Sequence, residues 1–159
     1  MSLEVEQTVV ERGDDAWVDD AWTLKEQIRS EEGVLKQRRN FFERAYRRAR
    51  VYVFHAGDEL IGFAAARTDG YILFLAVAPA YREEGFGERL VAAVAEDVDT
   101  VTCHARATND EALGFYKHLG FEEVRRISNY YQDGGDAYYL RLGDGGASLR
   151  ERLSELLGG

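Results

Sequence analysis

The chain alternates between two hydrophobic periods. Apolar residues at spacings of three and four predict helices, whereas alternation or a short continuous apolar run predicts a strand. This pattern predicts helices at 16–30, 33–49, 85–97 and 109–120, and strands at 3–11, 50–57, 59–70, 71–78, 100–107, 121–131 and 136–143. The run at 71–78 is apolar throughout, which predicts burial on both faces. Asp14 or Asp15 is placed to cap the first helix.

This order of elements predicts an α+β fold with a central mixed, mostly antiparallel β-sheet of about six to seven strands flanked by helices. A strand, helix, strand crossover lies in its middle. At 159 residues the chain has the length of a single domain. We expect that domain to span 1–145, followed by a helical tail at 146–159 whose leucines recur at helical spacing. Either a packed terminal helix or a dimer contact would explain the tail, so a monomer and a homodimer both stay open.

Charge and composition limit the partners and the cellular location that we expect for the protein. The chain carries 20 Lys and Arg against 29 Asp and Glu, a net charge of −9. This balance disfavours nucleic acid as a partner, because that affinity comes from neutralising phosphates. A surplus of acids is also typical of the acidic proteomes of salt-loving cells. The start of the chain has no targeting pattern and no apolar run reaches 18 residues, so we expect a cytoplasmic protein with no membrane contact.

Metal and thiol chemistry are not expected. The three histidines, His55, His104 and His118, fall on different predicted elements without ligand spacing. The lone Cys103 has no second thiol to pair with, and it alternates with Val101 on the expected core face of its strand. We therefore expect no metal site and a buried, chemically silent cysteine.

Two glycines and an arginine lie between the apolar strand at 71–78 and the helix that follows. Gly85 and Gly87 allow close backbone approach at the start of that helix, where free N–H groups and the positive dipole end suit a pyrophosphate. Arg82 adds a bidentate donor for phosphate oxygens. A tight helix entry without any ligand would use the same residues.

The segment Arg82-Glu83-Glu84-Gly85-Phe86-Gly87 resembles the pyrophosphate loop of the GNAT superfamily of acetyl-CoA-dependent N-acetyltransferases. About 20 residues on, Asn109 to Phe121 resembles the second motif of the same family, and the likeness covers roughly 50–142. The resemblance implies acetyl-CoA as cosubstrate, held by the loop residues 82–87, by the strand amides of Ala76 and Val77, and by Asn109. It also implies that Tyr116 protonates the leaving thiolate of CoA, which suits a phenol of pKa near 10. Packing in an amphipathic helix is the alternative for Tyr116.

The last hairpin is similar to that of N-terminal protein acetyltransferases, including the ribosomal-protein alanine acetyltransferases. The likeness implies that Tyr130 and Tyr131 line the acceptor cleft, although Gly135 departs from the acidic residue usual there. A tyrosine-rich hairpin could also reflect strand propensity alone. We expect transfer of an acetyl group to a protein or peptide α-amino group, with a small-molecule amine or polyamine as the alternative. A non-catalytic CoA-binding domain is a further alternative. The basic segment 36–50 is either a solvated face or an attractor of acidic acceptors.

His104 stands where these relatives carry a glutamate that draws the proton from the attacking amine. Strand alternation puts Thr102, His104 and Arg106 on one face, opposite Cys103. An imidazole of pKa near 6.5 could act as the base at neutral pH, and Arg106 is expected to lower that pKa. A solvent-facing histidine is the alternative, because an α-amine is already partly neutral at this pH.

Overall fold

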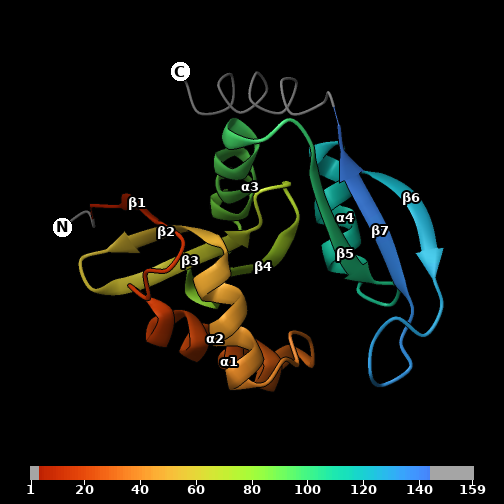
Figure 1. Ribbon diagram of the computed structural model, residues 1–159, viewed down its shortest axis with the longest axis horizontal. Coiled ribbons are helices and arrows are strands. Elements are labelled where there is room, and N and C mark those ends of the chain that lie inside the picture. The colour runs from red at the N-terminus through yellow and green to blue at the C-terminus, as the bar shows by residue number, and fades with distance from the viewer. Residues whose placement is uncertain (1–3, 144–159) are drawn as a thin grey trace.

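The structure, a computed structural model, describes residues 4–143 of the chain (Figure 1). This part of the chain forms seven strands, four α-helices and one 3₁₀ turn. In order they are β1 (Glu6–Val10), α1 (Val18–Glu32), α2 (Arg39–Arg48), β2 (Arg50–Ala56), β3 (Glu59–Ala66), β4 (Ile72–Val77), the 3₁₀ turn (Pro79–Tyr81), α3 (Phe86–Asp97), β5 (Val101–Arg106), α4 (Asp110–Leu119), β6 (Glu122–Ile127) and β7 (Ala137–Leu142). The predicted tail at 146–159 lies outside the described residues. None of the helices within 4–143 combines the length and hydrophobicity needed to cross a bilayer.

The first four strands form one antiparallel sheet in chain order, β1-β2-β3-β4. β2 and β3 are buried on both faces because helices cover both sides. On one face Phe42 and Tyr46 of α2 pack with Phe63 and Phe74, together with the buried stripe of α1. On the other face α3 brings Leu90 and its neighbours against the same strands.

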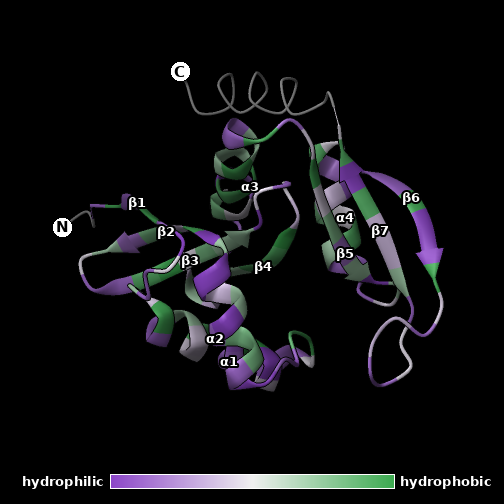
Figure 2. Cartoon of the chain, in the orientation of Figure 1, coloured by the Kyte–Doolittle hydropathy of each residue, from purple (hydrophilic) through white to green (hydrophobic). Residues whose placement is uncertain are grey.

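The last three strands form a second antiparallel sheet of order β5-β7-β6. Its inner face, with Val101, Cys103 and Leu140, joins α4 and α3 in one continuous core. β6 is an edge strand with a mostly exposed, hydrophilic sequence, in contrast to the hydrophobic β3 and β4 (Figure 2). The predicted fold class is therefore confirmed, with seven strands divided between two sheets.

Three details differ from the sequence prediction. Gly33 ends α1 by donating its N–H to the Arg29 carbonyl (2.9 Å) with a left-handed backbone, so residues 33–38 form a loop and the second helix starts only at Arg39. The N-cap of α1 is Trp17 rather than an aspartate, because Asp14 accepts from the Ala16 N–H in a turn ahead of the helix. β4 alternates between buried and half-buried residues, because its second face is only partly covered.

The two sheets touch at the start of β4. There Tyr71 and Thr102 form a parallel bridge, and the Thr102 N–H donates to the Gly70 carbonyl at 3.0 Å. A Cβ on Gly70 would lie 2.0 Å from the Thr100 carbonyl oxygen, so only glycine permits this approach. Beyond this point β4 and β5 pair with different neighbours, β4 with β3 and β5 with β7. The C-terminal half of β4 therefore has one ladder edge that no described strand occupies.

Candidate functional site

The open edge of β4 leads directly into the glycine-containing loop. Ala76 pairs with Phe63 and Val77 with Gly62 of β3, which leaves their other side toward β5. Val77 also lies near Gly87, where a Cβ would come within 3.1 Å of the Phe115 ring of α4. Glycine at this position thus lets the first turn of α3 pack closely against α4, beside the end of β4.

The start of α3 presents backbone donors rather than side chains. Gly85 is the N-cap, with φ +85° and no side-chain capping bond. A Cβ at Gly85 would meet nothing within 4 Å, so the space in front of the helix is open. The first N–H groups of a helix have no intrahelical partner and carry its positive dipole end. The loop therefore fits an anionic group such as a pyrophosphate, as its sequence predicts.

Arg82 lies at this loop but its guanidinium already has partners. It forms a bidentate pair with Glu32 at the end of α1 (3.1 and 2.7 Å), and its Nε donates to the Val77 carbonyl at 3.2 Å. The carboxylate raises the pKa of Arg82, so the charge is permanent. Sequence analysis identified the bidentate fork but missed Glu32, which lies 50 residues away along the chain.

Asn109 and Tyr116 sit at the two ends of α4. The Asn109 oxygen caps the helix by accepting from the Ala112 N–H at 3.1 Å, which leaves its amide NH₂ outside the cap. Tyr116 is buried, and its ring lies 5.1 Å from those of Phe115 and Phe121. Tyr116 and Cys103 belong to the same buried core. Burial and then Cys103 raise the pKa of Tyr116 well above its usual value, so the phenol keeps its proton at neutral pH.

Cys103 is buried, as the strand pattern predicts. Burial raises the pKa of its thiol to about 12, which removes it as a thiolate nucleophile. Because it alternates with His104, Tyr116 and His104 lie on opposite faces of β5. The two predicted catalytic residues are therefore separated by the β5 strand.

His104 lies in a cluster of tyrosines. The Tyr71 hydroxyl is 2.6 Å from His104 Nδ1 and the Tyr130 hydroxyl 3.4 Å, while the Tyr130 ring stacks on the imidazole at 4.3 Å. Tyr139, the cross-strand neighbour, lies at 5.0 Å. The structure thus joins a predicted catalytic residue to a predicted acceptor residue. Sequence analysis missed Tyr71, whose only signal is its position just after Gly70 at the start of the apolar strand.

The environment of His104 keeps it neutral. Burial lowers the pKa of the imidazole, and the charge of Arg125 lowers it further. The expectation that Arg106 does this is wrong, because Arg106 turns away to pair with Asp133 and to lie over the Tyr131 ring at 4.0 Å. Burial also raises the pKa of Tyr71 above its usual value, so the phenol donates its proton to Nδ1.

Asp133 of the β6–β7 loop connects this loop to β5 and to the 33–38 loop, next to the tyrosines around His104. It pairs with Arg106 of β5 (3.1 Å) and with Lys36 of the 33–38 loop (3.0 Å), and both cations hold the pKa of its carboxyl below the usual range. A Cβ at Gly135 would lie 2.7 Å from the Arg106 guanidinium, so a larger residue there would require the end of the Arg106 side chain to shift. The glycine that departs from the acidic residue usual in the resembled hairpins thus lies directly against the Arg106–Asp133 pair.

The 33–38 loop, which contains Lys36, is held in place by the buried side chain of Lys25. Lys25 of α1 is fully buried, with its ammonium over the Trp22 ring at 4.7 Å, and it donates to the Gln37 carbonyl. Burial lowers the pKa of this amine. The anchor holds the loop 33–38 opposite the β6–β7 hairpin.

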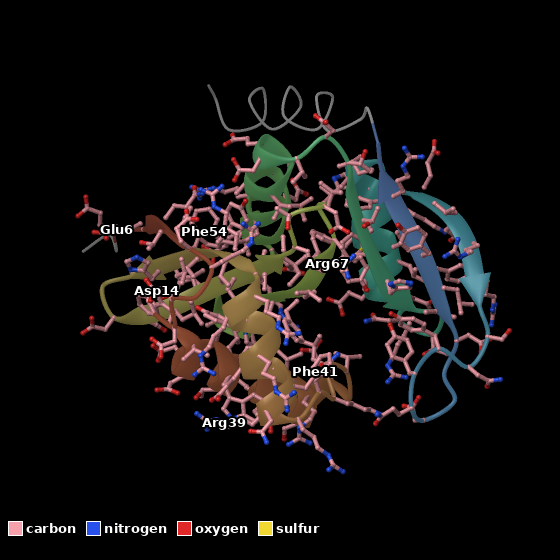
Figure 3. All side chains as sticks on the ribbon, viewed as in Figure 1. Glu6, Asp14, Arg39, Phe41, Phe54 and Arg67 are labelled. Carbon is pink, nitrogen blue, oxygen red and sulfur yellow. The ribbon has the colours of Figure 1, made fainter. Side chains whose placement is uncertain are left out.

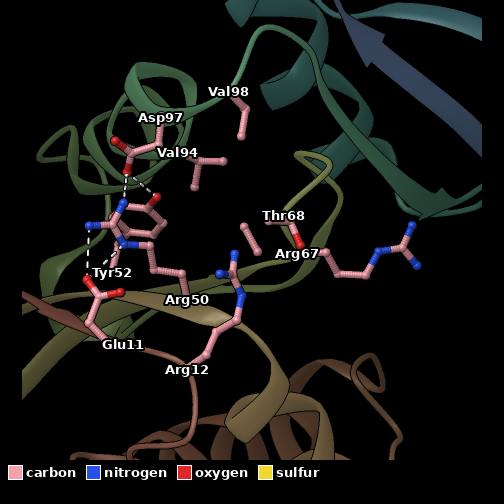
Figure 4. A pocket seen from close by; sticks show the side chains of 10 residues that line it. Glu11, Arg12, Arg50, Tyr52, Arg67, Thr68, Val94, Asp97 and Val98 are labelled. Atoms are coloured by element: carbon pink, nitrogen blue, oxygen red, sulfur yellow. Dashed lines mark hydrogen bonds and ion pairs between the residues drawn. The ribbon is translucent and has the colours of Figure 1, made fainter.

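A separate cavity of about 140 Å³ contains none of these residues (Figure 4). Arg50 bridges Glu11 at 3.0 Å and Asp97 at 2.6 Å along its wall. These charges satisfy one another, so we assign the cavity no role in the site. Among residues 4–143 no group of three or more His, Cys, Asp or Glu side chains is arranged to hold a metal ion.

Comparison with known proteins identifies the class. The model of the acetyltransferase (GNAT) domain matches residues 47–123. The N-alpha-acetyltransferase of Sulfurisphaera tokodaii is 35% identical over 113 residues, which cover 58% of this chain and 68% of that protein. The chain belongs to the GNAT acetyltransferase family.

Two further likenesses place it within the family. N-alpha-acetyltransferase 30 of Xenopus laevis is 37% identical over 99 residues, covering 54% of this chain and 36% of the relative. The chain thus spans about a third of that relative's length. The crystal structure of the ribosomal-protein-S18-alanine N-acetyltransferase from Escherichia coli superposes with a TM-score of 0.71 at 21% identity, over 87% of this chain and 92% of that one. This structural likeness supports the fold.

Proposed function

We propose that the chain is an acetyl-CoA-dependent N-acetyltransferase that acts on the α-amino group of a protein or peptide. The observation that carries the proposal is that Tyr116 lies on one face of β5 and the Tyr71–His104 contact on the other, close to the point where β4 and β5 part. A proton donor and a proton acceptor are thus available on the two sides of one strand. The names of the sequence relatives, which are N-alpha-acetyltransferases, support the same reaction.

The residues present fit acetyl-CoA. The backbone N–H groups at residues 83–87 suit its pyrophosphate, and the uncovered Gly85 leaves room for it. The free edge at Ala76 and Val77 can bind the extended pantetheine arm by strand-like hydrogen bonds, and the Asn109 amide can donate to that arm. Bound there, acetyl-CoA supplies an activated acetyl thioester. The solved structure of an Arabidopsis thaliana relative of this fold, NAA60, contains acetyl-CoA.

On the acceptor side the proton leaves through a hydroxyl. As the neutral amine attacks, its nitrogen becomes positively charged and gives a proton to the Tyr71 oxygen, while the proton of Tyr71 moves to His104 Nδ1, 2.6 Å away. On the other side Tyr116 donates its proton to the departing sulfur, which a phenol of raised pKa can do because it is protonated at neutral pH. Tyr130 and Tyr131 border the amine site and orient the acceptor. The acceptor step uses Tyr71 and His104, and the leaving-group step uses Tyr116.

The test is turnover. Purified protein is mixed with acetyl-CoA and a panel of peptides with different first residues, with N-acetylated peptides as blanks and polyamines as the competing class, and CoA release is followed. We expect release with free α-amines and no release with the blocked peptides. Faster turnover of polyamines would assign the small-amine activity instead. Tight CoA binding without turnover of any amine would make the chain a coenzyme-binding domain.

A further inference from the structure

The outer face of α2 is basic on a protein that is otherwise acidic. Phe41, Arg44 and Arg48 recur at spacings of three and four, so they share one helix face, and Arg38 lies one turn before them. All four are exposed, whereas Phe42 and Tyr46 on the opposite side are buried. We call Arg38, Phe41, Arg44 and Arg48 the outer face of α2.

The arginines of this face have no partners within residues 4–143. Arg39 and Arg47 pair with Glu43, the one acid of the helix. The structure shows no ion pair or hydrogen bond from the side chains of Arg38, Arg44 or Arg48 to any described residue. Segment 36–50 holds seven of the chain's 20 Lys and Arg residues, although the net charge is −9. Of these seven, only Arg38, Arg44 and Arg48 carry a charge that no described carboxylate compensates.

Phe41 adds an apolar contact to this charge. Its side chain is 58% exposed, the most exposed of the large hydrophobic residues described. Arginine and aromatic residues are enriched together where proteins recognise other macromolecules. Figure 3 shows Phe41 at the edge of the α1–α2 layer that faces the β6–β7 loop. A face made only for solvation would not need this ring.

The position of the face connects it to the acceptor site. α2 starts directly after the 33–38 loop, whose Lys36 pairs with Asp133 beside Tyr130 and Tyr131. A ten-residue helix is about 15 Å long, the span of about five extended residues. A polypeptide whose first residue lies at the tyrosine cluster could thus continue along α2.

We propose that the outer face of α2 binds an acidic stretch that follows the N-terminus of the acceptor protein. The inference rests on the proposed function, because it extends the same acceptor site. Carboxylates of the acceptor pair with Arg38, Arg44 and Arg48, and an apolar side chain among them covers Phe41. The face would select acidic acceptors mainly through KM, since it touches no reacting atom.

The experiment compares two peptides that share their first four residues and differ over the next five, which are Asp and Glu in one and Asn and Gln in the other. We expect kcat/KM to favour the acidic peptide about three- to tenfold at about 0.1 M KCl, the size of a few exposed ion pairs. The preference should fade near 1 M KCl, where the screening length is about 3 Å. Arg44→Glu should abolish the preference. Arg141→Glu, the same charge change at an exposed site on β7, should retain it.

Binding of fluorescent, N-acetylated versions of both peptides is measured by anisotropy in parallel. Absence of turnover with either peptide would count against the proposed function, while equal binding of the two would overturn the role of α2. Loss of the preference in Arg141→Glu as well as Arg44→Glu would also overturn it, because net charge alone would then explain the selectivity. Unlabelled acidic peptide and an oligouridylate are then compared as competitors of the labelled acidic peptide. If the oligouridylate displaces it at the lower concentration, the face is assigned to nucleic acid instead.

Discussion

Tyr116 is buried in the core that α4 shares with β5, and the rings of Phe115 and Phe121 lie 5.1 Å from its own ring. Phenylalanine at this position keeps the ring packing and loses only the proton donor. Tyr116→Phe should therefore lower kcat by about 10²-fold, the usual contribution of a general acid, with little change in affinity for CoA. Steady-state kinetics and calorimetric titration of CoA measure the two effects. Tyr138→Phe, which removes a hydroxyl from β7, is the control and should change neither; an unchanged kcat in Tyr116→Phe would remove it as the acid.

His104 is predicted to set the acidic limb of the pH profile. Its pKa lies below the usual value because of burial and Arg125, so the imidazole is neutral at pH 7 and gains its proton only below about 6.5. kcat/KM should accordingly fall as pH drops through that lowered pKa. His104→Ala should lower the plateau and remove this limb, and His104→Glu should restore part of the activity.

A variant of Arg125 tests more directly whether His104 sets the acidic limb of the pH profile. Arg125→Gln removes a positive charge near the imidazole, which stabilises the protonated form and raises the pKa of His104. The acidic limb should therefore move to higher pH while the plateau stays. A limb that does not move, or a His104→Ala profile that overlays the parent's, would refute the assignment.

At the scale of elements, the contact between the two sheets depends on one backbone position. Gly70 has φ +86°, and a Cβ would meet the Thr100 carbonyl at 2.0 Å. Gly70→Ala should lower the free energy of unfolding by about 2 kcal/mol or more, the sum of a left-handed backbone and an overpacked contact. Urea denaturation measures the loss. Gly57→Ala is the matched control, because Gly57 also has a positive φ (+58°) but open space around it; equal losses would show that the sheet contact is unimportant.

The junction of α1 with the pyrophosphate loop makes a second prediction at this scale. Glu32 already holds the guanidinium of Arg82, so a phosphate that binds Arg82 would have to compete with this carboxylate. Arg82→Ala should weaken CoA binding by about 1.5 to 3 kcal/mol, the range for a hydrogen bond to a charged group. Glu32→Gln should strengthen it by up to about 1 kcal/mol, since it releases a partly exposed pair. Glu31→Gln is the control, because it removes a neighbouring charge without releasing the guanidinium of Arg82. Calorimetry should show a smaller gain in CoA affinity for this variant than for Glu32→Gln. An equal gain would contradict the competition.

At the scale of the whole molecule, the net charge of −9 opposes a polyanionic coenzyme. Glu83 and Glu84 add to this locally, because both are exposed in the loop. Affinity for CoA should rise when KCl is raised from about 0.1 to 1 M, as the screening length falls from about 10 to 3 Å. Replacing Glu83 and Glu84 with glutamine should make the affinity for CoA less dependent on salt. The control is the double variant Asp15→Asn/Asp20→Asn, which removes the same charge near the start of α1 and should keep the salt dependence of the parent. Tighter binding at low salt would contradict the expectation.

Much of the fold follows from local pattern. Each strand and helix predicted within residues 4–143 exists, and most bounds agree within a few residues, because hydrophobic period, Gly120 and the turn at Gly57 act over short stretches of chain. The burial of Cys103 and the opposite direction of His104 follow from the same alternation. The sequence by itself also determined the family, since two motifs at a fixed spacing resembled it. The errors, at the cap of α1 and the start of α2, lie where a neighbouring loop overrode the local signal.

The tertiary structure decided which side chains meet. Tyr71 and His104 are 33 residues apart, Arg82 and Glu32 are 50 apart, and Lys36 and Asp133 are 97 apart. No local period encodes such contacts, because they depend on how the two sheets join at Gly70 and part beyond it. The same geometry turned Arg106 away from His104 and put Arg125 in its place. The sequence indicates which residues can act as acids, bases or ligands. Which side chains contact them and shift their pKa values is decided only by the packing of the whole molecule.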